Sequence, residues 1–91
     1  MKIRVEPLEE QFKKRYNRIV EVFRDTTNYP KSVQVDIKYK NKAYSLTEYF
    51  TPEMLTDYVL VGIGNKQHKY NDYLKAEVFV ADMIGEQDGK H

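Results

Sequence analysis

The chain contains no cysteine and no tryptophan, and only two histidines, three prolines and four glycines among its 91 residues. The lack of cysteine excludes a disulfide framework, a thiolate zinc site, an iron–sulfur cluster and a cysteine nucleophile. Two histidines provide little imidazole for a histidine-based metal site. The scarcity of glycine and proline leaves no visible interdomain linker, and the length suits one domain. We therefore expect no metal and no cofactor.

Long apolar runs are also missing from the sequence. No segment approaches the roughly 20 apolar residues of a membrane-spanning helix, and the first residues do not resemble a secretory signal peptide. A hydrophobic fraction of 41% beside a charged fraction of 32% is typical of a folded domain in water rather than of a disordered chain. These features predict a cytoplasmic protein without a membrane partner.

The formal net charge is only +1, but the charges are segregated along the chain. Residues 31–42 contain four lysines and one aspartate, whereas residues 48–57 contain three acids and no base. Residues 72–90 contain five acids and two lysines. A dedicated duplex-DNA-binding domain is usually more basic than this. The charge balance therefore argues against duplex DNA as the partner.

The first strong element is an amphipathic helix predicted over about residues 7–24. Pro7 suits the first helical position, because its missing N–H would have no helical partner there. We expect Phe12, Ile19 and Phe23 to be buried against the strand that follows. These three belong to an apolar stripe that spans one third of the helix circumference and consists of Leu8, Phe12, Tyr16, Ile19, Val20 and Phe23.

A β-hairpin is predicted next. Residues 32–40 alternate apolar and polar side chains, which is typical of a strand with one buried face. A tight turn at residues 41–42 would join it to a second strand and place Tyr39 opposite Tyr44. In this register Glu48 is the one charged side chain on the apolar face, where a carboxylate is either paired or functional.

The remaining segments are read from shorter patterns. Residues 2–5 alternate weakly as a short strand, and residues 58–63 are apolar on both faces, as in a covered central strand. Residues 51–56 suggest a short helical turn, and residues 64–70 a polar loop. Residues 73–84 favour a helix begun by an acidic or amide cap and ended by a glycine, although part of this segment also alternates like a strand.

Together these elements predict an α+β two-layer sandwich. An antiparallel sheet of three or four strands would carry one or two helices packed on one face, because the amphipathic helix needs a sheet to cover its apolar stripe. Residues 1–84 would form this single domain, followed by a polar C-terminal tail over residues 85–91.

No motif predicts catalysis. Gly62 and Gly64 resemble part of a dinucleotide-binding loop, but the third glycine that this loop needs is replaced by Gln67. Asp36-Ile37-Lys38 matches half of a metal-dependent nuclease site, yet the hairpin places no second carboxylate beside it. His68 has no paired acid and serine. We therefore predict no catalytic, cofactor-binding or metal-ligating residue and expect that the protein is not an enzyme.

The most distinctive feature is a set of eight tyrosines, several of which alternate with lysines. Tyrosine is a rigid, amphipathic contact residue in protein interfaces, and it is also simply a good strand former. Lysine interleaved with aromatic rings also suits single-stranded nucleic acid. The candidate partner-binding residues are Lys38, Tyr39, Lys40, Lys42, Tyr44, Tyr49, Lys66, His68, Lys69 and Tyr70.

The leading hypothesis is a small non-catalytic binding or regulatory protein that acts through protein–protein contacts. A composition rich in Lys, Tyr and Asn without Cys or Trp is typical of small open reading frames in AT-rich bacteria and their phages, which suggests a phage- or mobile-element-type inhibitor or accessory factor. The alternative is a single-stranded nucleic-acid-binding module that uses the Lys/Tyr-rich hairpin. The sequence leaves open the identity of the partner and whether the chain forms a homo-oligomer.

Overall fold

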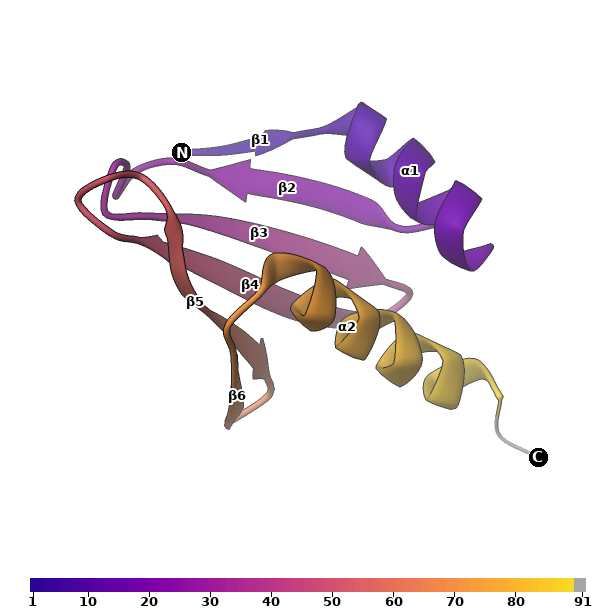
Figure 1. Cartoon of the computed structure of the whole chain (residues 1–91). Helices are drawn as coiled ribbons and strands as arrows, with labels where there is room; N and C mark the ends of the chain where they lie inside the picture. Colours follow the sequence, from indigo (N-terminus) through magenta and orange to yellow (C-terminus); the bar gives the residue numbers. More distant parts are fainter. Residues whose placement is uncertain (90–91) are drawn as a thin grey trace.

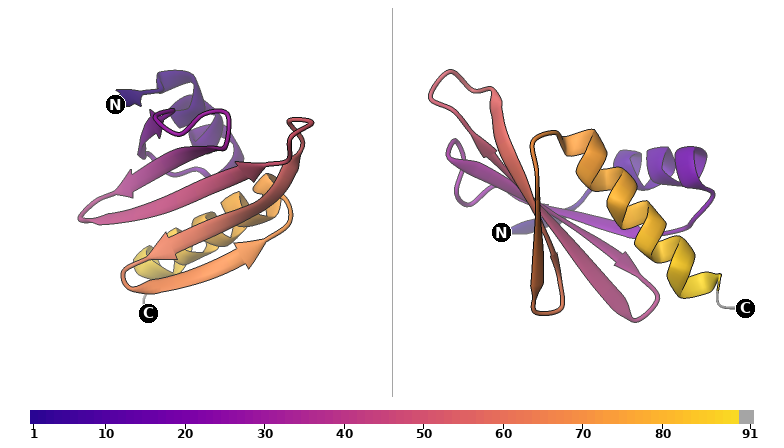
Figure 2. Two further views of the ribbon diagram at one scale, coloured as in Figure 1. Left: turned by 90° about the vertical axis from the view of Figure 1, so that its left-hand side faces the viewer. Right: turned by 60° about the horizontal axis from the view of Figure 1, so that its bottom comes forward.

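The computed structural model describes residues 1–89, which form one antiparallel sheet with two helices on a single face (Figures 1 and 2). The six described strands lie in the sheet in the same order as in the sequence. This confirms the α+β two-layer class, whereas the expected three or four strands were too few. The elements are β1 (Lys2–Arg4), α1 (Glu6–Tyr16), β2 (Glu21–Asp25), β3 (Ser32–Tyr39), β4 (Lys42–Phe50), β5 (Thr56–Ile63), β6 (Lys66–Tyr70) and α2 (Tyr73–Asp88).

The first helix is shorter than its apolar stripe predicts. It ends at Tyr16 because Asn17 adopts a left-handed backbone with φ of 58°, and its N–H donates to the Lys13 carbonyl oxygen at 2.8 Å. The chain then enters β2, where Val22 is buried. Ile19, expected in the core, is 78% exposed in the connection. The β-branched residues after the helix favour a strand, and their alternation overlaps the helical pattern by chance.

The hairpin has the predicted faces but a different register. Tyr39 pairs with Lys42, so the turn is formed by Lys40 and Asn41, one residue earlier than expected. Lys40 has a φ of 55°, as a tight hairpin turn requires. The register is displaced by two residues, and Ile37 rather than Tyr39 lies opposite Tyr44. Because side chains alternate with a period of two, this displacement leaves every side chain on its predicted face.

The second half of the chain contains one strand more than predicted. The polar residues 66–70, expected as a loop, pair with β5 as the edge strand β6. The expected helical turn at residues 51–56 is a non-helical turn in which Met54 has a φ of 68°. The helix α2 begins as predicted, since the Asp72 carboxylate accepts from the Leu74 N–H at 2.8 Å. It continues beyond Gly85, so residues 85–88 are its last turn, while residues 90–91 lie outside the described part.

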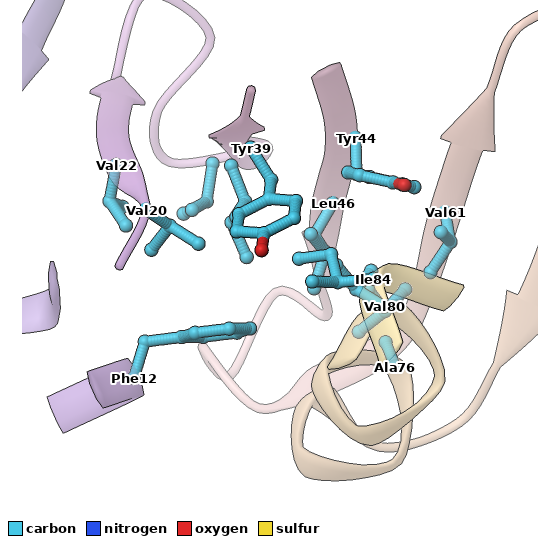
Figure 3. Packing of buried hydrophobic residues seen from close by; sticks show 13 residues of the cluster. Phe12, Val20, Val22, Tyr39, Tyr44, Leu46, Val61, Ala76, Val80 and Ile84 are labelled. Carbon is cyan, nitrogen blue, oxygen red and sulfur yellow. The ribbon is translucent and has the colours of Figure 1, made fainter. Parts of the chain in front are cut away.

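The hydrophobic core lies between the sheet and the two helices (Figure 3). Phe12 of α1 points into it with 2% exposure, and its ring lies 4.7 Å from that of Tyr16. Arg15 of α1 and Glu77 of α2 form an ion pair at 3.2 Å that links the helices. Several core side chains from the central strands and α2 have no exposed surface, namely Leu46, Val59, Val61, Ala76, Val80 and Ile84.

Replacing Phe12 with alanine should lower the free energy of unfolding by about 3–5 kcal/mol, because a buried aromatic ring would leave a cavity between α1 and the sheet. Ile19→Ala is the matched control, and it should change this free energy by less than about 0.5 kcal/mol because the side chain is exposed. Urea denaturation of both variants measures the difference. Equal midpoints for the two variants would contradict the position of α1 over the sheet.

Candidate functional site

The sequence-predicted contact residues are divided between the two faces and one end of the sheet. Tyr39 and Tyr44 are in the core, with 7% and 1% exposure, rather than at the surface. The Tyr39 hydroxyl donates to Asp88, and the Tyr44 hydroxyl donates to Gln87 at 2.9 Å. These two tyrosines therefore join the hairpin to the last turn of α2 by hydrogen bonds, and they are not available to a partner.

His68 and Tyr70 of β6 lie on the helix-covered face. Their rings are centred 4.8 Å and 5.6 Å from that of Phe79 on α2. Both side chains are half-buried. They belong to the packing of α2 against the edge of the sheet, so their contribution to partner binding is limited to the edges that they expose.

The four lysines near the two turns gather at one end of the sheet. Strand pairing places Lys38 beside Ala43, and it places Lys66 at the start of β6, next to the same end of β4. Lys40 is held by Asp88, with Nζ 2.9 Å from the carboxylate. Among residues 1–89, no ion pair involves Lys38, Lys42 or Lys66. The hairpin turn and the β5–β6 turn thus lie at the same end of the sheet.

Tyr49 and Lys69 are on the helix-free face, together with Tyr58. The rings of Tyr49 and Tyr58 stack with centroids 4.7 Å apart and an interplanar angle of 20°. The Lys69 ammonium lies 4.6 Å from the centroid of the Tyr58 ring. Because β5 lies between β4 and β6, the Tyr58 ring is enclosed by Tyr49 on one side and Lys69 on the other. We call these three residues the tyrosine ridge.

In the sequence, Tyr58 opens the apolar run of residues 58–63 that predicts a covered central strand. The alternation of side chains along β5 gives its true position. Val59 and Val61 have no exposed surface, so Tyr58 and Leu60 point to the other face. Tyr58 is half-buried, as is Leu60, its neighbour on the helix-free face. The ridge thus rises from a face that also carries partly apolar side chains.

A shallow hollow of about 630 Å³ lies at the end of β4 and β5 away from the ridge. Small residues of β4 and β5, Ala43, Ser45 and Gly62, line it. A Cβ on Gly62 would come within 2.7 Å of the Ser45 Oγ, so only glycine fits there without a shift. Asp36 borders the hollow, and its carboxylate is held by Lys2 at 2.5 Å and by the Gln34 side-chain amide at 2.9 Å.

Acidic residues mark the end of the sheet opposite the lysines. Glu48, Glu53 and Asp57 lie in or beside the connection between β4 and β5. Glu48 is half-buried at the edge of the apolar face and accepts a hydrogen bond from the Thr56 hydroxyl. None of these three carboxylates forms an ion pair within residues 1–89. The sheet therefore carries unpaired charges of opposite sign at its two ends.

Comparison with protein-family models, with curated proteins and with solved structures found no match to this chain. In the described part, no group of three or more His, Asp or Glu side chains is arranged to hold a metal ion. No helix of residues 1–89 is long and apolar enough to cross a membrane. The function must therefore be inferred from the surface itself.

The contacts of Asp88 predict a pH-sensitive last turn of α2. Hydrogen bonds from Tyr39 and Lys40 hold the pKa of the Asp88 carboxyl below its usual value. Because the pKa of this carboxyl is lower in the folded chain than in the unfolded chain, its ionised form stabilises the fold at pH values above the unfolded pKa of about 3.9. This stabilisation is lost as the pH falls through the folded pKa. Protection of the amides of residues 85–88 from hydrogen exchange should therefore decrease below about pH 4.

Asp88→Asn should show reduced protection at these amides already at pH 7. Asp82→Asn is the control, because Asp82 is exposed on the same helix and has no ion pair within residues 1–89. Protection factors from NMR, corrected for the intrinsic exchange rate at each pH, give the comparison. Equal protection in the two variants would show that Asp88 does not hold the helix end.

Proposed function

We propose that this protein is a small non-catalytic binding protein that acts by occupying the surface of a protein partner with the helix-free face of its sheet. The observation that carries the proposal is the tyrosine ridge, in which Tyr49, Tyr58 and Lys69 are stacked before any partner arrives. A rigid aromatic group loses little conformational entropy on binding, and tyrosine is enriched among the residues that dominate binding energy.

The geometry of the ridge favours a protein over a nucleic acid. Bases bind to tyrosine by stacking on a free ring face. Both faces of the Tyr58 ring are already occupied, by the Tyr49 ring and by the Lys69 ammonium. The edge of the ring and its hydroxyl remain available, and these are suited to apolar contact and hydrogen bonding with a protein surface.

The charge of the helix-free face supports the same choice. Some of its basic groups are paired with acids: Lys2 pairs with Asp36, and Asp25 takes the N-terminal ammonium at 3.2 Å. Arg4 is likewise engaged, with Nε 2.8 Å from the Glu9 carboxylate. A mixed surface of this kind gives little of the phosphate neutralisation on which nucleic-acid affinity depends.

Affinity capture from the native host with mass spectrometry tests the proposal. The wild-type protein should retain a protein that Tyr58→Ala loses, because the substitution removes the centre of the ridge. Leu74→Ala is the matched control, since Leu74 is 53% exposed on α2, on the opposite side of the molecule. Loss of the captured protein with both variants, or with neither, would contradict the use of this face.

Single-stranded nucleic acid is the second candidate, favoured by Lys38, Lys42 and Lys66 at one end of the sheet. We expect a single strand of about 20 bases to bind no more tightly than about 10 µM at physiological salt, with a similar value for Tyr58→Ala. Fluorescence anisotropy at two salt concentrations measures this. Tight binding that weakens steeply with salt and depends on Tyr58 would replace the protein partner with a nucleic acid.

A further inference from the structure

The last turn of α2 is attached to the rest of the protein by polar side chains rather than by apolar burial. Ile84, which has no exposed surface, is the last buried residue of the helix. Beyond it, Gln87 accepts a hydrogen bond from the Tyr44 hydroxyl, and Asp88 accepts one from the Tyr39 hydroxyl. A segment held in this way can open locally while the core residue before it stays in place.

The sequence of this turn also favours opening. Gly85 lies within the helix, where glycine is the least favourable residue after proline. Glu86 and Asp88 place two negative charges at the negative end of the helix dipole, and the turn contains no basic residue of its own. Its closed position therefore depends on cations from outside the helix, which Arg18 and Lys40 supply.

Three donors from separate segments converge on the Asp88 carboxylate. Arg18, in the connection between α1 and β2, places its Nε 3.3 Å from a carboxylate oxygen, and Lys40 of the hairpin turn places its Nζ 2.9 Å from the other. Tyr39 of β3 donates its hydroxyl. The ends of α1, of the hairpin and of α2 lie together at this end of the molecule (Figure 1). Two cations and a hydroxyl that meet at one carboxylate form a carboxylate-binding site, which Asp88 fills from within the chain.

Asp88 does not satisfy every donor of this site. The Nε atom of Arg18 is buried and has no hydrogen-bond partner within residues 1–89, so its contact with Asp88 is an ion pair without a hydrogen bond. Buried donors in folded proteins are normally bonded. A carboxylate that is not fixed at the end of a helix could approach this donor with better alignment.

A groove of about 690 Å³ begins at the same place and runs between α1 and the ends of β2 and β3. Lys40 borders the groove as well as the carboxylate site. Lys38 adds a second positive charge, and Ile19, which is 78% exposed, adds apolar surface. Glu10 and Glu21 also line the groove and would repel a uniformly negative nucleic-acid strand. A peptide that combines acidic and apolar residues suits this lining better.

We propose that Arg18, Lys40 and the Tyr39 hydroxyl form a binding site for a carboxylate in an acidic peptide segment of a partner protein. Asp88 closes this site, and the Tyr39 hydroxyl becomes available only when the last turn of α2 opens. The apparent affinity for the peptide is therefore reduced by the small fraction of molecules in which the turn is open. The site lies apart from the tyrosine ridge and does not depend on it.

Two substitutions in the last turn should shift the peptide affinity in opposite directions. The probe is a fluorescein-labelled peptide of four glutamates followed by two leucines, and its anisotropy measures binding. Asp88→Asn should tighten binding about tenfold, because it weakens the hydrogen bonds that keep the turn closed. Gly85→Ala should weaken binding about fivefold, because alanine stabilises the helix and the added Cβ meets no atom within 4 Å.

Matched variants separate this mechanism from a general effect of charge. Asp82→Asn removes the same charge from an exposed position on α2 and should leave the affinity unchanged. Adding Arg18→Gln to Asp88→Asn should abolish the tenfold gain, because the open site then lacks one of its donors. The same peptide with glutamines in place of its glutamates should not bind to any of these proteins.

Hydrogen exchange gives a second measurement that works on the wild-type protein. Saturation with the peptide should lower the protection of the amides of residues 86–88, because the bound peptide and the closed turn exclude each other. The amide of Val61, in a central strand, should keep its protection.

Equal peptide affinities of the Asp88→Asn and Asp82→Asn variants, or no peptide binding by the Asp88→Asn variant, would overturn the proposal. Tighter binding by the Gly85→Ala variant would do the same. If the Asp88→Asn variant prefers a short single strand of DNA to the peptide, the site belongs to phosphate groups instead. None of these results involves Tyr58, so the proposed function of the helix-free face is decided separately by the capture experiment.

Discussion

Both helices cover the same face of the sheet, and this constraint governs the rest of the molecule. Every strand alternates its side chains between a covered face and a water-exposed one. The apolar residues of the central strands, such as Leu46 and Val61, are buried completely against the helices. The intervening residues form a broad surface that no element of residues 1–89 covers (Figure 2). The stacked rings of Tyr49 and Tyr58 lie on this surface.

The period of two in β3 and β4 was enough to predict which side chains are buried, but not how the strands pair. A displacement by two residues preserves every face, so apolar alternation carries no information that distinguishes the predicted register from the observed one. The left-handed conformation of Asn17 and the pairing of β6 were missed for a related reason. An asparagine within a helical pattern and the polar edge strand Lys66–Tyr70 give no hydrophobic signal of their own.

The candidate site was predictable only in part. Tyr49 and Lys69 were candidate contact residues and lie on the helix-free face, whereas Tyr39 and Tyr44 proved to be core residues with hydroxyls satisfied by α2. Their partners, Gln87 and Asp88, were assigned to a tail, and a tail supplies no reason to bury a tyrosine. The importance of Tyr58 depends on a contact between three strands, which a pattern within one strand does not contain.

The edges of the sheet influence what kind of assembly the face can support. An edge strand exposes unpaired N–H and C=O groups, and chains that join along such edges form open-ended stacks. Here β1 is only three residues long, and β6 carries Lys66 and Lys69, whose charges oppose the approach of another strand. Growth along the hydrogen-bonding direction is therefore disfavoured at both margins. A sheet with blocked margins and one open face favours closed complexes of defined size over fibres.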